Sequence, residues 1–250
     1  GDKKYQFYVA KAYYFGQGVA KNKKRSLQWY TKSSDQGYAI AKNNLSFFYS
    51  DGEIVDQDLG KYFNLLCEAA TSGLSIAQDN LGVMYSYGLG VTLDYKEAFK
   101  WFKKSAEQGN ASAQNSLGFL YGSGYGISLD YKEAVKWYRK SAEQGNDWGQ
   151  YNLGLMYMDG KGVSSDYQEG HRWYKKAAKQ GHKNAINNLE EITDVTLSDI
   201  DHSKRIVEMY LEKMSYERTD TMCYKIKNNE GSRLFKTSIF LLKTHGIKYL

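Results

Sequence analysis

The sequence contains no proline and only two cysteines in 250 residues. Because proline breaks helix interiors, its absence is compatible with a chain that is helical over most of its length. Cys67 and Cys223 lie far apart and form no CxxC pair, so the sequence predicts neither a zinc site nor a disulfide framework. No run of apolar residues is long enough to cross a membrane, which excludes a transmembrane helix.

Motifs that carry chemistry are also missing. The chain has no GxSxG nucleophile elbow and no GxxxxGK[ST] phosphate loop, and its four histidines show no metal-ligand spacing. Glycine pairs such as Gly124 and Gly126 follow a predicted helix and not a strand, which favours turns over a nucleotide site. We therefore expect no enzyme activity, no cofactor, no metal ion and no small-molecule substrate.

The positive charge is modest and unevenly distributed. The formal net charge is +6, and residues 201–250 carry ten lysines or arginines against six aspartates or glutamates. We interpret this segment as a solvated basic surface and expect no nucleic-acid partner. Nucleic-acid binding is the weaker alternative, and it would show an affinity that falls steeply with salt.

One segment occurs almost unchanged twice. DYKEAFKWFKKSAEQGN runs from Asp94 to Asn110, and DYKEAVKWYRKSAEQGN begins 36 residues later, at Asp130. A fixed offset of this size indicates a repeat architecture. The offset extends through most of the chain and aligns two columns of residues: Trp29, Leu65, Trp101, Trp137 and Trp173, and Leu45, Leu81, Leu117, Leu153 and Leu189.

Each repeat predicts a first helix with one apolar face. In the fourth repeat, Ala113, Leu117, Leu120 and Tyr121 have the spacing of a single helix face. Gly118 lies beside this face, where the absence of a side chain lets a neighbouring helix approach. A glycine-rich turn then ends the helix.

A second helix follows in each repeat. Asp130 and Glu133 predict a capping box at its start, in which the aspartate caps backbone N–H groups and the glutamate reaches back. Trp137 and Tyr138 lie on its apolar face, and we expect Trp137 to be a buried aromatic. Gly145 ends the helix. Because one helical hairpin cannot bury this face alone, successive hairpins must stack.

The segment AQNSLGFLYGSGYGISLDYKEAVKWYRKSAEQGN resembles the Sel1-like repeat, a relative of the tetratricopeptide repeat. The resemblance implies an all-α fold, a right-handed α/α superhelical solenoid of helix-turn-helix repeats, with a C-terminal helical cap. It also implies a scaffold or adaptor that binds proteins, and bacterial members include immunity proteins. Five repeats match the pattern, at residues 5–37, 41–73, 77–109, 113–145 and 149–181. Departures from the pattern are Ile54, Leu65, Gly149 and Gly170.

Two domains are expected. Residues 1–192 form the solenoid, which ends in one further helix of the first type at 185–192. Residues 193–250 form a non-repeat helical extension. Residues 198–214 have apolar residues at helical spacing and would cover the end of the stack. Residues 232–250 are either another helix folded on that cap or an apolar segment that contacts a partner.

The solenoid predicts a concave surface lined by first helices. We expect an apolar stripe bordered by amides, able to hold a peptide, with Trp148 as an aromatic anchor. The alternative is that the apolar column only packs neighbouring repeats. The predicted partner-binding residues are Asn43, Phe47, Asp79, Val83, Asn115, Phe119, Trp148, Tyr151, Leu155, Met158 and Asn187.

Two functions remain open at this point. The first is an adaptor that holds a protein partner in the groove. The second is an immunity or inhibitor protein that neutralises a toxic bacterial effector such as a secreted hydrolase. The sequence starts with Gly1, so the compartment would be periplasmic or extracellular if an export signal was removed, and cytoplasmic otherwise.

Overall fold

The computed structural model describes residues 1–193. The chain divides into two units, residues 1–182 and 183–250, and we describe the first unit by itself. The predicted cap at 198–214 and the segment 232–250 lie outside the described residues. The helices of the first unit are α1 (Lys3–Phe15), α2 (Lys23–Asp35), α3 (Ala39–Asp51), α4 (Leu59–Thr71), α5 (Ser75–Tyr87), α6 (Tyr95–Glu107), α7 (Ala111–Ser123), α8 (Tyr131–Glu143), α9 (Asp147–Asp159) and α10 (Tyr167–Lys179).

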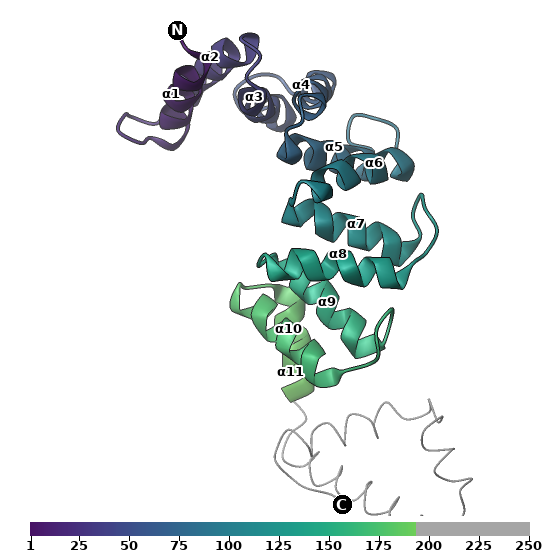
Figure 1. Ribbon diagram of the computed structural model, residues 1–250. Helices are drawn as coiled ribbons and strands as arrows, with labels where there is room; N and C mark the ends of the chain where they lie inside the picture. The colour runs from purple at the N-terminus through teal and green to yellow at the C-terminus, as the bar shows by residue number, and fades with distance from the viewer. Residues whose placement is uncertain (194–250) are drawn as a thin grey trace, which may run out of the picture. The chain divides into compact units, whose positions relative to one another are not determined.

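The first unit is a stack of helical hairpins. Odd-numbered helices pair with the helix that follows, and each second helix then packs on the first helix of the next repeat (Figure 1). All ten helices contain 13 residues. No strand occurs in the described part of the chain. The predicted all-α solenoid of helix-turn-helix repeats is confirmed. The second unit begins with α11 (Lys183–Thr193).

Aspartates cap four of the five second helices and Asn22 caps α2, but the predicted capping box is only half correct. Asp130 Oδ1 accepts hydrogen bonds from the backbone N–H groups of Lys132 and Glu133, at 2.9 and 3.0 Å. The glutamate does not reach back, because the N–H of Asp130 already donates to the carbonyl oxygen of Tyr121, at 2.9 Å. The Glu133 carboxylate instead forms an ion pair with Lys136.

The hairpin core has an aromatic ring against a glycine. A Cβ atom on Gly118 would lie 2.7 Å from the ring of Tyr138, so the glycine is needed for this close approach. Tyr138 is therefore the buried aromatic of the second helix. Trp137 is less buried than predicted: its ring is half-buried against the core, and the Lys140 ammonium lies 4.2 Å from the ring centroid.

A ladder of glutamine side chains joins successive repeats. Gln144 Nε2 donates to Gln114 Oε1 at 2.7 Å, and Gln114 Nε2 donates to the carbonyl oxygen of Ala106 at 3.2 Å. Gln114 thus connects three helices, α6, α7 and the end of α8. Gln78 forms the same two bonds one repeat earlier, with Gln108 and Ala70.

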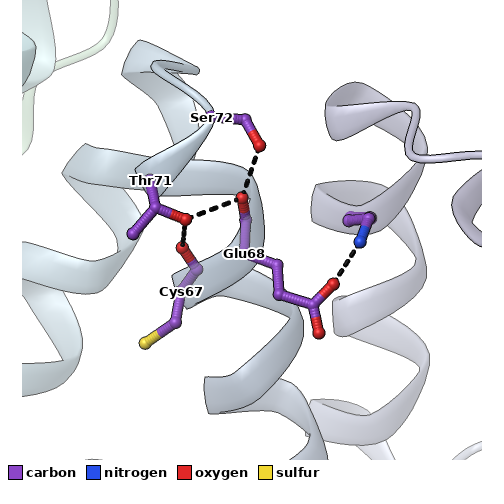
Figure 2. A network of polar contacts seen from close by, with 5 residues as sticks. Cys67, Glu68, Thr71 and Ser72 are labelled. Atoms are coloured by element: carbon purple, nitrogen blue, oxygen red, sulfur yellow. Dashed lines mark hydrogen bonds and ion pairs between the residues drawn. The ribbon is translucent and has the colours of Figure 1, made fainter.

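The second repeat departs from the ladder. Lys42 and Ser72 occupy the two glutamine positions, and Lys42 forms an ion pair with Glu68. Figure 2 shows Glu68 in this network, where its carbonyl oxygen accepts hydrogen bonds from the hydroxyls of Ser72 and Thr71, at 2.7 and 3.1 Å. The ion pair between Lys42 on α3 and Glu68 on α4 therefore replaces the contact between two glutamines, and it joins the two helices of one hairpin.

Candidate functional site: a groove on the first helices

A groove of about 590 Å³ lies across three first helices, α5, α7 and α9. We call it the central groove. Val83, Asn115, Phe119 and Trp148 line it, and all four were predicted as partner-binding residues. Whether they bind a partner remains a prediction. The volume lies in the range of small-ligand and peptide pockets.

Large aromatic side chains are exposed around the central groove. Tyr87 is 72 % exposed, Trp148 52 % and Phe119 49 %. The Phe119 ring packs edge-on against Tyr125, with 5.9 Å between ring centroids, and Tyr125 stacks on Tyr95 at 4.9 Å. Aromatic side chains contribute strongly to protein interfaces, and exposed apolar groups that cluster in one place mark interaction sites.

Asparagine side chains connect neighbouring first helices. Asn80 Nδ2 on α5 donates to Asn43 Oδ1 on α3 at 3.0 Å, and Asn152 Nδ2 on α9 donates to Asn115 Oδ1 on α7 at 2.8 Å. We call this series the amide ladder. Asn43 was expected at the surface to bond a peptide backbone, but it is buried. Its amide bonds other asparagines because adjacent first helices lie close enough for direct contact.

Asp79 stands where the amide ladder is interrupted. It is equivalent to Asn43 and Asn115, and it too is buried and not exposed as expected. Its Oδ1 atom has no hydrogen-bond partner among the described residues. Burial raises the pKa of Asp79 to about 6, and a hydrogen bond from the Ser112 hydroxyl offsets part of that rise.

The other predicted residues lie outside the lining of the central groove. Phe47 lines a separate pocket of about 210 Å³ that also includes α1 residues. Tyr151 stacks on His182 with 4.6 Å between ring centroids, and Leu155 and Met158 are half-buried on α9. Asn187 is exposed on α11, in the second unit.

Sequence reasoning missed two groups of groove residues. Ser116 and Asn152 belong to the column that follows the predicted one, and the 36-residue offset alone could have indicated them. Leu93 and Tyr125 come from the loops between paired helices. Their position depends on the loop conformation, which residue spacing does not give.

Other kinds of site find no support in the part of the chain described. Residues 1–193 contain no group of three or more His, Cys, Asp or Glu side chains that could hold a metal ion. None of the helices in this part is both long and apolar enough to cross a membrane. The central groove is thus the strongest candidate site.

The hairpin stack and its groove define a helical-repeat solenoid. A family model described as the Sel1 repeat matches five segments, residues 4–38, 39–74, 75–110, 111–146 and 149–182. The chain belongs to the Sel1 repeat family. This repeat is generally a non-catalytic fold that mediates protein interactions.

Solved structures agree with this assignment. A Sel1 repeat protein from Oxalobacter formigenes is 31 % identical, the alignment covers 76 % of each chain, and the TM-score is 0.73. A protective antigen present in uropathogenic Escherichia coli strains, with an SLR fold, is 27 % identical with a TM-score of 0.70. That alignment covers 96 % of this chain and 54 % of the antigen, so this chain spans about half of the antigen's length.

A more distant structure shares the fold alone. An immunity protein from Pseudomonas aeruginosa is 20 % identical with a TM-score of 0.50, and the alignment covers 72 % of this chain and 69 % of that protein. A search of curated proteins gave no match.

Proposed function

We propose that this protein is an interaction scaffold, or adaptor, that binds a segment of a partner protein in the central groove. The observation that carries the proposal is the exposure of Tyr87, Phe119 and Trp148 around one groove. Large aromatic surface in contact with water is unfavourable. Its burial against a partner would stabilise the complex by roughly 25 cal/mol per Å² of apolar surface.

The groove also supports an extended ligand. It crosses three repeats and combines apolar side chains with the amides of Asn115 and Asn152. A peptide in such a groove would bury its side chains among the aromatics and bond the polar groups along the floor. A compact small molecule would use only part of this length.

Affinity capture followed by titration tests the proposal. The intact chain captures proteins from a native lysate, and each captured protein is purified and titrated against wild type, Trp148→Ala and Phe119→Ala. We expect both variants to bind about tenfold more weakly or worse, since interface aromatics carry much of the binding energy. Tyr5→Ala, which removes another exposed aromatic away from the groove, is the matched control.

Thermal unfolding of the same variants separates binding from folding. Trp148 is half-exposed and contacts the His182 ring, at 4.5 Å between centroids, so its truncation should change stability by less than about 1 kcal/mol. Equal affinity for wild type and both groove variants would overturn the proposal.

The second function, an inhibitor of a toxic effector, is an outcome of the same experiment. It would require that a captured partner is an enzyme and that the chain abolishes its activity in proportion to binding. The likeness to the immunity protein from Pseudomonas aeruginosa concerns the fold, so it favours neither role. A partner that keeps its activity while bound supports the adaptor.

A further inference from the structure

The amide ladder changes at one step, and both members of the pair change together. At the steps on either side, an asparagine donates to an asparagine one repeat earlier, as Asn152 does to Asn115. At the middle step, the positions that lie 36 residues before Asn152 and Asn115 are Ser116 and Asp79. Serine is shorter than asparagine and aspartate carries charge, so this step lacks the amide contact of its neighbours.

The changed step leaves a carboxylate oxygen without a partner. Asp79 is 8 % exposed and its Oδ1 atom bonds no other described residue. A buried polar atom without a hydrogen bond lowers the stability of the folded chain, and a charged one lowers it further. An asparagine in this position would avoid the charge, as it does in the repeats before and after.

Asp79 lies outside the lining of the central groove, one turn before a lining residue of the same helix. Val83, one turn further along α5, lines the groove, and so do Asn115 and Ser116 of the facing helix α7. The remaining sides of α5 pack against α4 and α6. We therefore expect a group from outside the protein to approach Asp79 from the groove side of α5.

The charges on the first helices favour a cation. Helices α5, α7 and α9 contain no lysine or arginine, and their charged side chains are Asp79, Asp147 and Asp159. In the same three repeats the second helices carry basic residues, for example Lys104 and Lys140 in their last turns. The residues that line the groove carry no charge themselves, so a cation would meet no positive side chain among them. Phe119 and Trp148 offer ring faces that attract a cation as well.

We infer that the central groove recognises a partner segment by an arginine or lysine side chain whose charged end pairs with Asp79. This inference rests on the proposed function, since it assigns a specificity to the same groove. The cation supplies the donor that the amide ladder lacks at Ser116, and the aromatic rings cover the aliphatic part of the cationic side chain. The Oδ1 atom of Asp79 then gains in the complex the partner that it lacks in the free protein.

A random peptide library displayed on phage is the probe. It is selected against the intact wild-type chain, and enriched peptides are synthesised and titrated against wild type and Asp79→Asn. We expect enriched peptides to share an arginine or lysine at one position and to bind Asp79→Asn at least tenfold more weakly. Asp147→Asn, which removes another acidic charge from the first helices, should change affinity less than threefold.

A double-mutant cycle makes the pairing specific. Replacing the shared arginine by citrulline, which is neutral and similar in shape, should weaken binding to wild type about tenfold and leave binding to Asp79→Asn unchanged. A higher melting temperature of Asp79→Asn, as expected from removal of the buried charge, would show that the variant is folded.

The outcomes distinguish this inference from the function on which it rests. Peptides that lose affinity for Phe119→Ala but show no basic preference and bind Asp79→Asn normally would overturn the cation inference alone. A selection in which no peptide depends on Phe119 or Trp148 would count against both.

Discussion

At the scale of single residues, Gly118 and Gly122 lie one turn apart on α7 and differ in what surrounds them. A Cβ atom on Gly118 would meet the Tyr138 ring at 2.7 Å, whereas one on Gly122 would meet the end of the Met156 side chain at 3.4 Å. The first glycine is therefore required for packing, and the second is not.

We predict that Gly118→Ala lowers the free energy of unfolding by about 1–3 kcal/mol, since the added methyl group displaces a buried ring. Gly122→Ala should be neutral or stabilise by up to about 1 kcal/mol, because alanine favours a helix over glycine. Urea unfolding of both variants measures the difference. Equal effects would contradict the assigned packing.

Tyr138 and Trp137 provide a second comparison, on neighbouring residues of α8. Tyr138 is 4 % exposed, while Trp137 is half-buried beneath Lys140. We predict that Tyr138→Ala costs about 3–5 kcal/mol of stability and Trp137→Ala markedly less, although tryptophan is the larger residue. Chemical denaturation monitored by circular dichroism checks the order, and the reverse order would show that the tryptophan is the main core residue.

The raised pKa of Asp79 predicts that the stability of the fold depends on pH. Its pKa is about 6 in the folded chain, above the value of about 3.9 typical of unfolded chains. The native state therefore holds this proton more tightly. The stability linked to protonated Asp79 is fully present below about pH 4 and is lost as pH rises through about 6. Helices α5 and α7 carry no other charged residue that would mask the effect.

The free energy of unfolding is measured for wild type and for Asp79→Asn across this pH range. The contributions of the other carboxylates cancel in the difference between the two. The advantage of the variant in free energy of unfolding should grow by up to about 3 kcal/mol between about pH 4 and pH 7.5. A difference that stays constant with pH would show that Asp79 is not desolvated.

At the scale of elements, the glutamine ladder fixes how one hairpin meets the next. Gln114 accepts a hydrogen bond from Gln144 of its own hairpin and donates to the end of the preceding helix, α6. We predict that Gln114→Ala lowers stability by about 1–3 kcal/mol, because it removes two hydrogen bonds and leaves buried partners. Gln114→Glu, which keeps the size and the acceptor, tests whether the donor matters.

Thermal unfolding reports on both variants. Loss of stability in Gln114→Ala together with recovery in Gln114→Glu would contradict a role for the Nε2 donor. The expected result is that neither variant reaches wild-type stability.

The helices themselves could be predicted from sequence. The 36-residue offset gave the hairpins, and the column that contains Gly118 gave the close approach of paired helices. The role of Glu133 could not be predicted. The backbone N–H of Asp130, which a capping glutamate would bind, donates instead to the carbonyl oxygen of Tyr121, nine positions earlier. The deeper burial of Tyr138 than of Trp137 depends on the facing helix, which spacing within one helix does not define.

At the scale of the whole molecule, the groove was predicted in outline. Phe119 was predicted there from its repeat column, and Trp148 because it is an aromatic residue where another repeat has Ser112. Both line the groove. Asn43 was interpreted wrongly as a surface group, because the sequence does not show that Asn43 and Asn80 bond each other. The interruption at Asp79 became visible only once that ladder was known.

Photo-cross-linking with the natural partner is the most direct test of binding in the central groove. A benzophenone amino acid replaces Phe119 in the groove or, as the control, Trp137 on the second helix, and each variant is irradiated with the captured and purified partner. We predict a cross-linked complex from position 119 and none from position 137. Cross-linking from position 137 alone would contradict the account.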